Sequence, residues 1–169
     1  MGHRPISAGI LGVRGRAGTL EFFLAHPGGP FYAKREHGVW SIPKGLLESS
    51  DSDRLAAAQR ELVEETGYAL PEGPYVAIGE VLTKSKKTIV AWAVRANFDP
   101  AAMVSNTFEI EWPPRSKRRA HFPEMDRAGW FGLEEAETKI HEAQRPFLER
   151  ASQPDVLEAL GLRGGDALD

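Results

Sequence analysis

Alternating apolar and polar residues divide the chain into short strands and a few helical stretches. Five stretches have the apolar content and spacing of β-strands: residues 7–14, 20–26, 75–83, 88–96 and 107–112. The first two flank a glycine-containing turn and predict a hairpin. The fourth is the most apolar, so we expect it at the centre of a sheet. The fifth alternates strictly, which predicts a strand with one apolar face.

Two stretches, at about residues 52–66 and 133–143, have helical character. We expect Pro146 to end or kink the second helix and residues 155–161 to add one short helical turn. Loops are predicted at residues 31–44 and 115–121, and a loose tail at residues 163–169. This order of elements predicts one mixed α/β domain over residues 1–169, with helices on both faces of the sheet and a core at about residues 6–150.

Composition sets limits on the kind of protein. A chain of 169 residues with 41% hydrophobic and 27% charged residues suits one globular domain. It has no cysteine, which excludes disulfides, a thiol nucleophile and a Cys-based metal site. Neither a transmembrane run nor a signal-peptide pattern is found, so we expect no membrane partner and a cytoplasmic location. The net charge of −3 argues against a general nucleic-acid binder.

Three carboxylates in the first helical stretch form the strongest candidate site. Glu61, Glu64 and Glu65 are spaced i, i+3 and i+4, which places them on one side of a helix. A solvated helix face, with Arg60 bonded to Glu64, would explain the same pattern. Like charges at this spacing repel one another, however, and a hard divalent cation with oxygen ligands, Mg²⁺ or Mn²⁺, would offset that repulsion.

The residues around these carboxylates carry a resemblance. The chain runs through Pro43, Lys44 and Gly45, then a polar loop, then the continuous run from Arg60 to Gly67. This order resembles the signature of the Nudix (MutT-like) hydrolases, a glycine followed by a helix with Arg-Glu and Glu-Glu at fixed spacing. The resemblance covers roughly residues 6–150. It implies a Nudix-type α/β/α sandwich, with Glu61, Glu64, Glu65 and the Gly45 carbonyl as metal ligands.

The loop before the helix departs from the family pattern by one extra residue. The first glutamate of the pattern falls at Ser52, between Asp51 and Asp53. In the family this glutamate is chiefly structural and pairs with the arginine of the signature. We expect one of the two aspartates to pair with Arg60; Asp51 or Ser52 could also cap the helix.

The resemblance also suggests a general base, which in this family is a signature glutamate or a carboxylate from a later loop. Glu61 and Glu64 are the signature candidates here. Glu124 lies where the later loop would fall and is our first choice, with Glu109 and Glu111 as rivals. Either rival could equally belong to a solvated strand edge.

Several other residues are candidates for substrate contacts. Lys44 is expected at the mouth of the site, where its charge can meet a phosphate. Lys84, Lys86 and Lys87 could bind further phosphates or simply solubilise a turn. Trp40, Tyr32 and Phe31 could stack on a base, although packing is the more frequent role of such aromatics.

The resemblance implies hydrolysis of a pyrophosphate bond in a nucleoside diphosphate derivative by metal-activated water. Residues 40–45 are similar to the Pro-Lys-Gly sequence that precedes the signature in dinucleoside polyphosphate hydrolases. Dinucleoside polyphosphates and NTPs, oxidised NTPs included, are therefore the leading substrates. A non-catalytic nucleotide-binding module is an alternative. An RNA 5′-end pyrophosphohydrolase is another, and it would use the basic loop that contains Arg115, Lys117, Arg118 and Arg119. Nudix proteins are often dimers, so a homodimer is possible.

Overall fold

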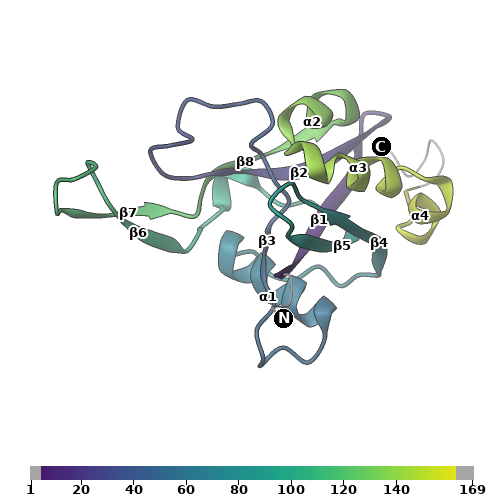
Figure 1. Cartoon of the computed structure of the whole chain (residues 1–169). Coiled ribbons are helices and arrows are strands. Elements are labelled where there is room, and N and C mark those ends of the chain that lie inside the picture. Colours follow the sequence, from purple (N-terminus) through teal and green to yellow (C-terminus); the bar gives the residue numbers. More distant parts are fainter. Residues whose placement is uncertain (1–4, 163–169) are drawn as a thin grey trace.

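The computed structural model describes residues 5–162 and contains a six-stranded mixed sheet (Figure 1). Its strands are β1 (Ile6–Arg16), β2 (Thr19–Pro27), β3 (Lys44–Leu46), β4 (Tyr75–Leu82), β5 (Thr88–Arg95) and β8 (Met125–Gly132). The order is β4-β5-β1-β2-β8, and β3 pairs with the beginning of β1. Only β1 and β5 are parallel among these pairs, and β5 lies inside the sheet as its apolar sequence predicts.

Helices cover both faces of this sheet, which confirms the predicted α/β/α sandwich. Helix α1 (Arg54–Thr66) lies on one face, and α2 (Leu133–Lys139), α3 (Arg145–Ala151) and α4 (Pro154–Ala159) lie on the other (Figure 1). Two short 3₁₀ turns, η1 (Pro100–Ala102) and η2 (Glu142–Gln144), complete the elements. No helix in the described part of the chain is long and apolar enough to cross a membrane.

Alternate residues of each strand enter separate cores on the two faces. Ala8 and Ile10 of β1 are buried towards α1, whereas Leu11 and Val13 are buried with the second set of helices.

Helix α1 begins at the N-cap Asp53, whose carboxylate accepts a hydrogen bond of 2.7 Å from the Ala56 N–H. Such a cap contributes about 1 kcal/mol to helix stability. The helix ends at Gly67, whose φ of 74° places it in the left-handed region.

The region after β5 differs from the sequence prediction. Strands β6 (Thr107–Glu111) and β7 (Arg119–Pro123) form a separate two-stranded hairpin that projects from the body (Figure 1). Residues 107–112 therefore do not join the main sheet, and residues 119–121 of the predicted basic loop belong to a strand. The alternating pattern was compatible with either pairing. The apolar face of the hairpin is completed locally by Phe108 and Phe122, whose ring centroids are 6.1 Å apart.

The C-terminal part also differs from the prediction. Residues 125–132 form the edge strand β8 beside β2 rather than a simple lead into a helix. Pro146 does not end a helix but begins α3, because the first turn of a helix needs no N–H donor at that position. Leu160 and Leu162 are buried in the core, so the packed region extends past residue 150. The predicted tail at residues 163–169 lies outside the described residues.

Candidate active site

Helix α1 carries three glutamates on the side that faces β3. Glu61 and Glu65 are each only 9% exposed, whereas the Glu64 side chain is 47% exposed. The backbone N–H of Lys44 donates a hydrogen bond of 3.2 Å to the Glu65 carboxylate. Gly45 lies directly against Glu61, and a Cβ at position 45 would clash with that carboxylate. A larger residue at position 45 would therefore push the Glu61 carboxylate away from β3.

Arg60 connects the loop before α1 to these glutamates. Its guanidinium donates two hydrogen bonds to the Asp51 carboxylate, of 2.8 and 2.9 Å, and a third of 3.1 Å to the Leu46 carbonyl. The same group lies 2.9 Å from a Glu61 oxygen and 3.1 Å from a Glu64 oxygen. One cation therefore fixes the loop and neutralises part of the acidic cluster.

The extra loop residue leaves the arginine with a carboxylate partner. Asp51 makes the ion pair with Arg60, whereas Asp53 is the N-cap and makes no such pair in the described structure. The two hydrogen bonds from Arg60 are the main reason that the pKa of Asp51 falls to about 2. The same contacts raise the pKa of Arg60. Each aspartate thus has a separate structural task.

The buried glutamates lack full compensation of their charge. Burial raises the pKa of Glu65 to about 8; the Lys44 N–H opposes this, and the nearby carboxylates of Glu61 and Glu124 add to it. Burial likewise raises the pKa of Glu61, against the hydrogen bond from Arg60. Burial also lowers the pKa of the Lys44 amine, although Glu65 and Glu61 attract its proton.

These residues fit a hard divalent cation by the chemistry of their donors. Carboxylate oxygens and the carbonyl of Gly45 are the ligand types that Mg²⁺ and Mn²⁺ prefer. A cation would also supply the positive charge that the raised pKa values of Glu61 and Glu65 show to be lacking. Within residues 5–162, no three acidic or histidine side chains have their ligand atoms placed so that they could hold a metal ion as they stand. Glu61 and Glu64 bond to Arg60 instead, so a cation must compete with that guanidinium.

Among the candidates for the general base, only one lies beside the acidic cluster. The carboxylate of Glu124, between β7 and β8, is close enough to Glu65 to raise its pKa. Glu109 and Glu111 lie on the projecting hairpin instead. Glu109 pairs with Arg119 at 2.7 Å, and Glu111 accepts a hydrogen bond of 2.8 Å from the Lys117 N–H. These two carboxylates therefore belong to the hairpin and not to the site.

A cavity of about 330 Å³ opens beside Lys44, and we call it the inner cavity. Its wall includes Tyr32, Ser41, Met125, His141 and Gln144. Gln144 is buried and joins two segments, because its amide donates to the Ser41 hydroxyl and accepts from the Ile42 N–H. Apart from Tyr32 and Lys44, these lining residues were not predicted. They come from distant parts of the chain, and no local sequence pattern marks them.

A second cavity of about 560 Å³ adjoins the first, and we call it the outer cavity. Both cavities share Arg35, Gly38 and His141 in their walls, and the outer one adds Lys84 and Arg145. Lys84 lies 3.6 Å from Glu142, and both side chains are exposed. Lys87 lies close enough to Lys44 to lower its pKa, whereas Lys86 lies exposed on the turn.

The aromatic candidates separate into different roles. Trp40 is only 3% exposed; its indole N–H donates to Glu36, and its ring packs against His26 and Phe131. Of the two roles considered for Trp40, the structure agrees with packing and not with stacking on a base, because its ring is part of the core. Tyr32 is 38% exposed and lines the inner cavity, so it stays available to a ligand.

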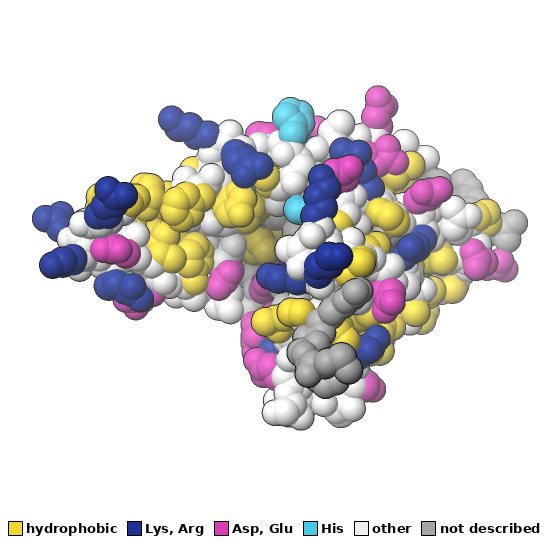
Figure 2. Space-filling model, viewed as in Figure 1, with side chains coloured by type: hydrophobic (Ala, Val, Ile, Leu, Met, Phe, Trp, Pro, Cys, Tyr) yellow, Lys and Arg dark blue, Asp and Glu magenta, His cyan; other side chains and the backbone are white. Residues whose placement is uncertain are grey.

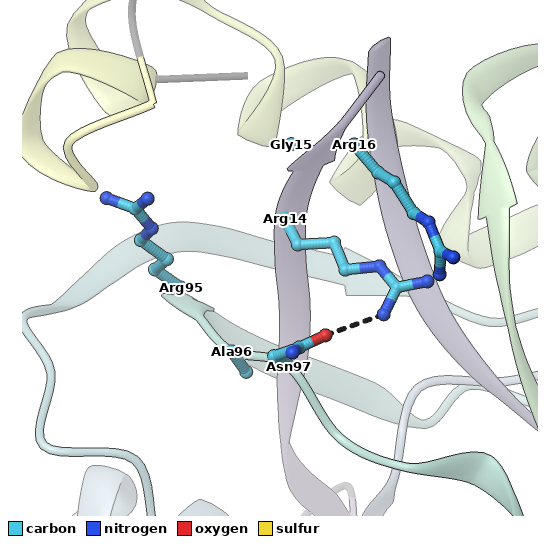
Figure 3. A pocket seen from close by; sticks show the side chains of 6 residues that line it. All are labelled: Arg14, Gly15, Arg16, Arg95, Ala96 and Asn97. Atoms are coloured by element: carbon cyan, nitrogen blue, oxygen red, sulfur yellow. Dashed lines mark hydrogen bonds between the residues drawn. The ribbon is translucent and has the colours of Figure 1, made fainter. Parts of the chain in front are cut away.

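Another cavity, of about 550 Å³, lies at the opposite end of β1 (Figure 3). Arg14, Arg16 and Arg95 surround it, and Arg14 donates a hydrogen bond of 2.7 Å to Asn97. Figure 3 shows Arg14 and Arg16 side by side, with Arg95 turned towards the other face of the sheet. None of the described residues that line this cavity has a carboxylate, so within the described chain it lacks the metal-ligand chemistry of the α1 site.

This protein has a mixed sheet between helices, and the carboxylates of α1 lie beside Gly45 of β3. The family model described as "NUDIX domain" matches residues 3–151, and the chain therefore belongs to the NUDIX family. The family prediction made from the residues around Arg60 is confirmed.

Solved structures share this fold. An Ap4A hydrolase of C. elegans in a binary complex is 22% identical, covers 86% of this chain and 95% of its own, and has a TM-score of 0.62. The NUDIX domain of Shewanella oneidensis NrtR, complexed with ADP ribose, is 14% identical, with coverage of 89% and 88% and a TM-score of 0.61. A MutT protein from Methanosarcina mazei is 21% identical, with coverage of 89% and 95% and a TM-score of 0.55.

One curated relative matches a short segment. An uncharacterized 17.7 kDa protein of Enterobacteria phage T4 is 57% identical over 30 residues. The match spans 18% of this chain and 20% of the phage protein, so it says nothing of activity.

Proposed function

We propose that this protein hydrolyses a pyrophosphate bond in a nucleoside diphosphate derivative with the help of Mg²⁺ or Mn²⁺. The observation that carries the proposal is the pair of buried carboxylates, Glu61 and Glu65, beside Gly45 and next to a cavity that begins at Lys44. Burying uncompensated carboxylates is costly, and a bound cation that also meets a diphosphate offsets that cost.

Each residue of the site has a proposed task. Glu61, Glu64, Glu65 and the Gly45 carbonyl would hold the divalent ion, which would neutralise the diphosphate and lower the pKa of a bound water. Lys44 contacts a phosphate oxygen from the cavity side. Glu124 takes the proton from the attacking water, because it is the later-loop carboxylate that faces Glu65. Arg60, which is held by Asp51, balances part of the charge of Glu61 and Glu64 until the ion competes for these carboxylates.

The two adjoining cavities support a substrate that is longer than a diphosphate. The inner cavity suits a base or ribose near Tyr32, and the outer cavity adds the cations Lys84 and Arg145. We therefore propose dinucleoside polyphosphates as preferred substrates over NTPs. The likeness to the C. elegans Ap4A hydrolase agrees with this choice. A site that only binds a nucleotide would not need three metal-ligand carboxylates, which favours catalysis.

The proposal is tested by a panel of nucleotides assayed with Mg²⁺, with Mn²⁺ and with EDTA. The panel contains NTPs, oxidised NTPs, dinucleoside polyphosphates and ADP-ribose. We expect metal-dependent release of nucleotide products, fastest with dinucleoside polyphosphates. Glu64→Gln should abolish turnover and keep the thermal unfolding of the wild type. Glu135→Gln, an exposed change on α2, is the matched control and should stay active. If Glu64→Gln still hydrolysed the substrates, Glu64 would be ruled out as an essential metal ligand.

The role of Glu124 gives a second prediction. Glu124→Gln should lower kcat by about 10²-fold or more with little change in KM, because a general base acts in the transition state. Glu109→Gln serves as the control, since Glu109 pairs with Arg119 on the hairpin. Initial rates over a substrate series measure both constants. Equal activity of the two variants would assign the proton transfer to another group.

A further inference from the structure

The hairpin of β6 and β7, residues 107–123, ends in a turn where cations gather. We call the hairpin the arm and residues 112–118 its tip. Figure 2 shows Lys and Arg side chains at the left end of the molecule, over the tip. Arg115, Lys117 and Arg118 are exposed. In the described part of the chain, none of these three side chains lies within ion-pair distance of a carboxylate.

Charges along the strands of the arm, in contrast, are paired. Glu109 lies 2.7 Å from Arg119 and 3.5 Å from His121 across the two strands. Glu111 is engaged with the backbone N–H of Lys117 at 2.8 Å. The unpaired positive charge is thus concentrated at the tip. A net charge of −3 for the whole chain hides this separation.

Aromatic rings lie next to this charge. Phe31, in the loop between β2 and β3, is 65% exposed and meets Trp112 edge to face at 5.5 Å. The same loop arches over the arm (Figure 1), and Gly29, with φ of 94°, lies against the Phe108 ring. An exposed apolar ring therefore contacts Trp112, which belongs to the same tip as the three cations.

The arm begins at the active site but its tip lies beyond both cavities. The Glu124 N–H donates to the Asn106 carbonyl at 2.8 Å, and the Asn106 N–H donates to the Glu64 carbonyl at 3.3 Å. Five-residue strands extend roughly 17 Å from that base. No tip residue lines the inner or outer cavity. A small nucleotide bound in the cavities therefore leaves the tip without a partner.

We propose that the tip and Phe31 bind single-stranded nucleic acid. Arg115, Lys117 and Arg118 meet backbone phosphates, and Phe31 stacks on an unpaired base, which is how single strands are bound without sequence preference. A duplex would not offer a free base face to the ring. The choice of nucleic acid over another polyanion rests on the proposed function, since the arm rises from a site that binds nucleotides.

Binding is measured by fluorescence anisotropy of a short labelled single-stranded RNA, and of a DNA of the same sequence, with EDTA present. The test variant is Arg115→Ala/Arg118→Ala. Its control is Arg16→Ala/Arg54→Ala, which removes the same charge from exposed arginines elsewhere. We expect the tip variant to bind about tenfold more weakly and to lower the salt slope by about 1.4 between about 50 and 200 mM salt. The control should match the wild type. Phe31→Ala should weaken binding about tenfold with an unchanged slope, and Phe31→Tyr should not.

Several results would overturn the proposal: no binding by the wild type, equal binding by the tip and control variants, or tip-dependent binding to anionic vesicles with RNA affinity unchanged. Loss of a dimer in light scattering with unchanged RNA affinity would make the tip a subunit contact and would also overturn it. Because EDTA prevents hydrolysis, the outcome is separate from turnover. An inert nucleotide panel with tip-dependent RNA binding would contradict the proposed function and leave the arm inference standing.

Discussion

Asp51 and Asp53 show how two neighbouring carboxylates acquire different tasks from their positions alone. Both were candidates to pair with Arg60, and the sequence offered no way to choose. Asp53 has the extended backbone of an N-cap, so its carboxylate is used by the Ala56 N–H. Asp51 lies further back in the loop and reaches the guanidinium with both oxygens. The inserted residue thus changes the loop and keeps an ion pair for Arg60.

The ion pair predicts a particular dependence of stability on acid. The pKa of Asp51 is lowered from 3.8 to about 2, so the folded state favours the ionised form. This stabilisation is present above about pH 4 and is lost as the pH falls towards 2. Asp51→Asn should lose this part of the pH dependence of the unfolding free energy, measured with urea. Asp155→Asn, an exposed change in α4, should follow the wild type at every pH. Parallel curves for all three proteins would refute the assigned pair.

Among the elements, the turn between β4 and β5 carries the next prediction. Both lysines of this turn, Lys86 and Lys87, are exposed, but only Lys87 lies close enough to Lys44 to lower the pKa of its amine. The double change Lys86→Ala/Lys87→Ala should raise KM more for substrates with long phosphate chains than for short ones. Of the single variants, Lys87→Ala should account for most of the effect, because its charge faces the site. Kinetics on a series of chain lengths measure this. An equal effect on KM for all phosphate chain lengths would show that the turn does not bind the phosphate chain.

Elements with strong local signals were predictable from the sequence, and those that depend on partners were not. Helix α1 and the first hairpin have clear periodicity and caps, so their bounds agree within a few residues. Residues 107–112 form a strand as predicted, but periodicity does not reveal which strand pairs with it. Pro146 was misjudged because a proline ends one helix and begins another equally well.

At the scale of the whole molecule, the arm joins two regions of opposite charge: the acidic site lies at its base and the basic tip at its end. The base of the arm touches the backbone of Glu64, and its tip carries the unpaired cations. The sequence predicts the carboxylates as a site because they lie within five residues of one helix, and their role stays a prediction. It did not identify the cavities, whose walls combine residues from Pro27 to Gln144. Such a wall exists only when the chain is folded.

We propose that the α1 carboxylates bind the cation that the reaction needs. Mn²⁺ binding followed by electron paramagnetic resonance, without nucleotide, tests this claim most directly. The wild type should bind Mn²⁺ saturably, and Glu64→Gln/Glu65→Gln should weaken binding at least about tenfold, because it removes two charged ligands. Glu134→Gln/Glu135→Gln, which removes two exposed carboxylates from the first turn of α2, should bind as the wild type does. Equal Mn²⁺ affinity of the α1 variant and the wild type would contradict the account.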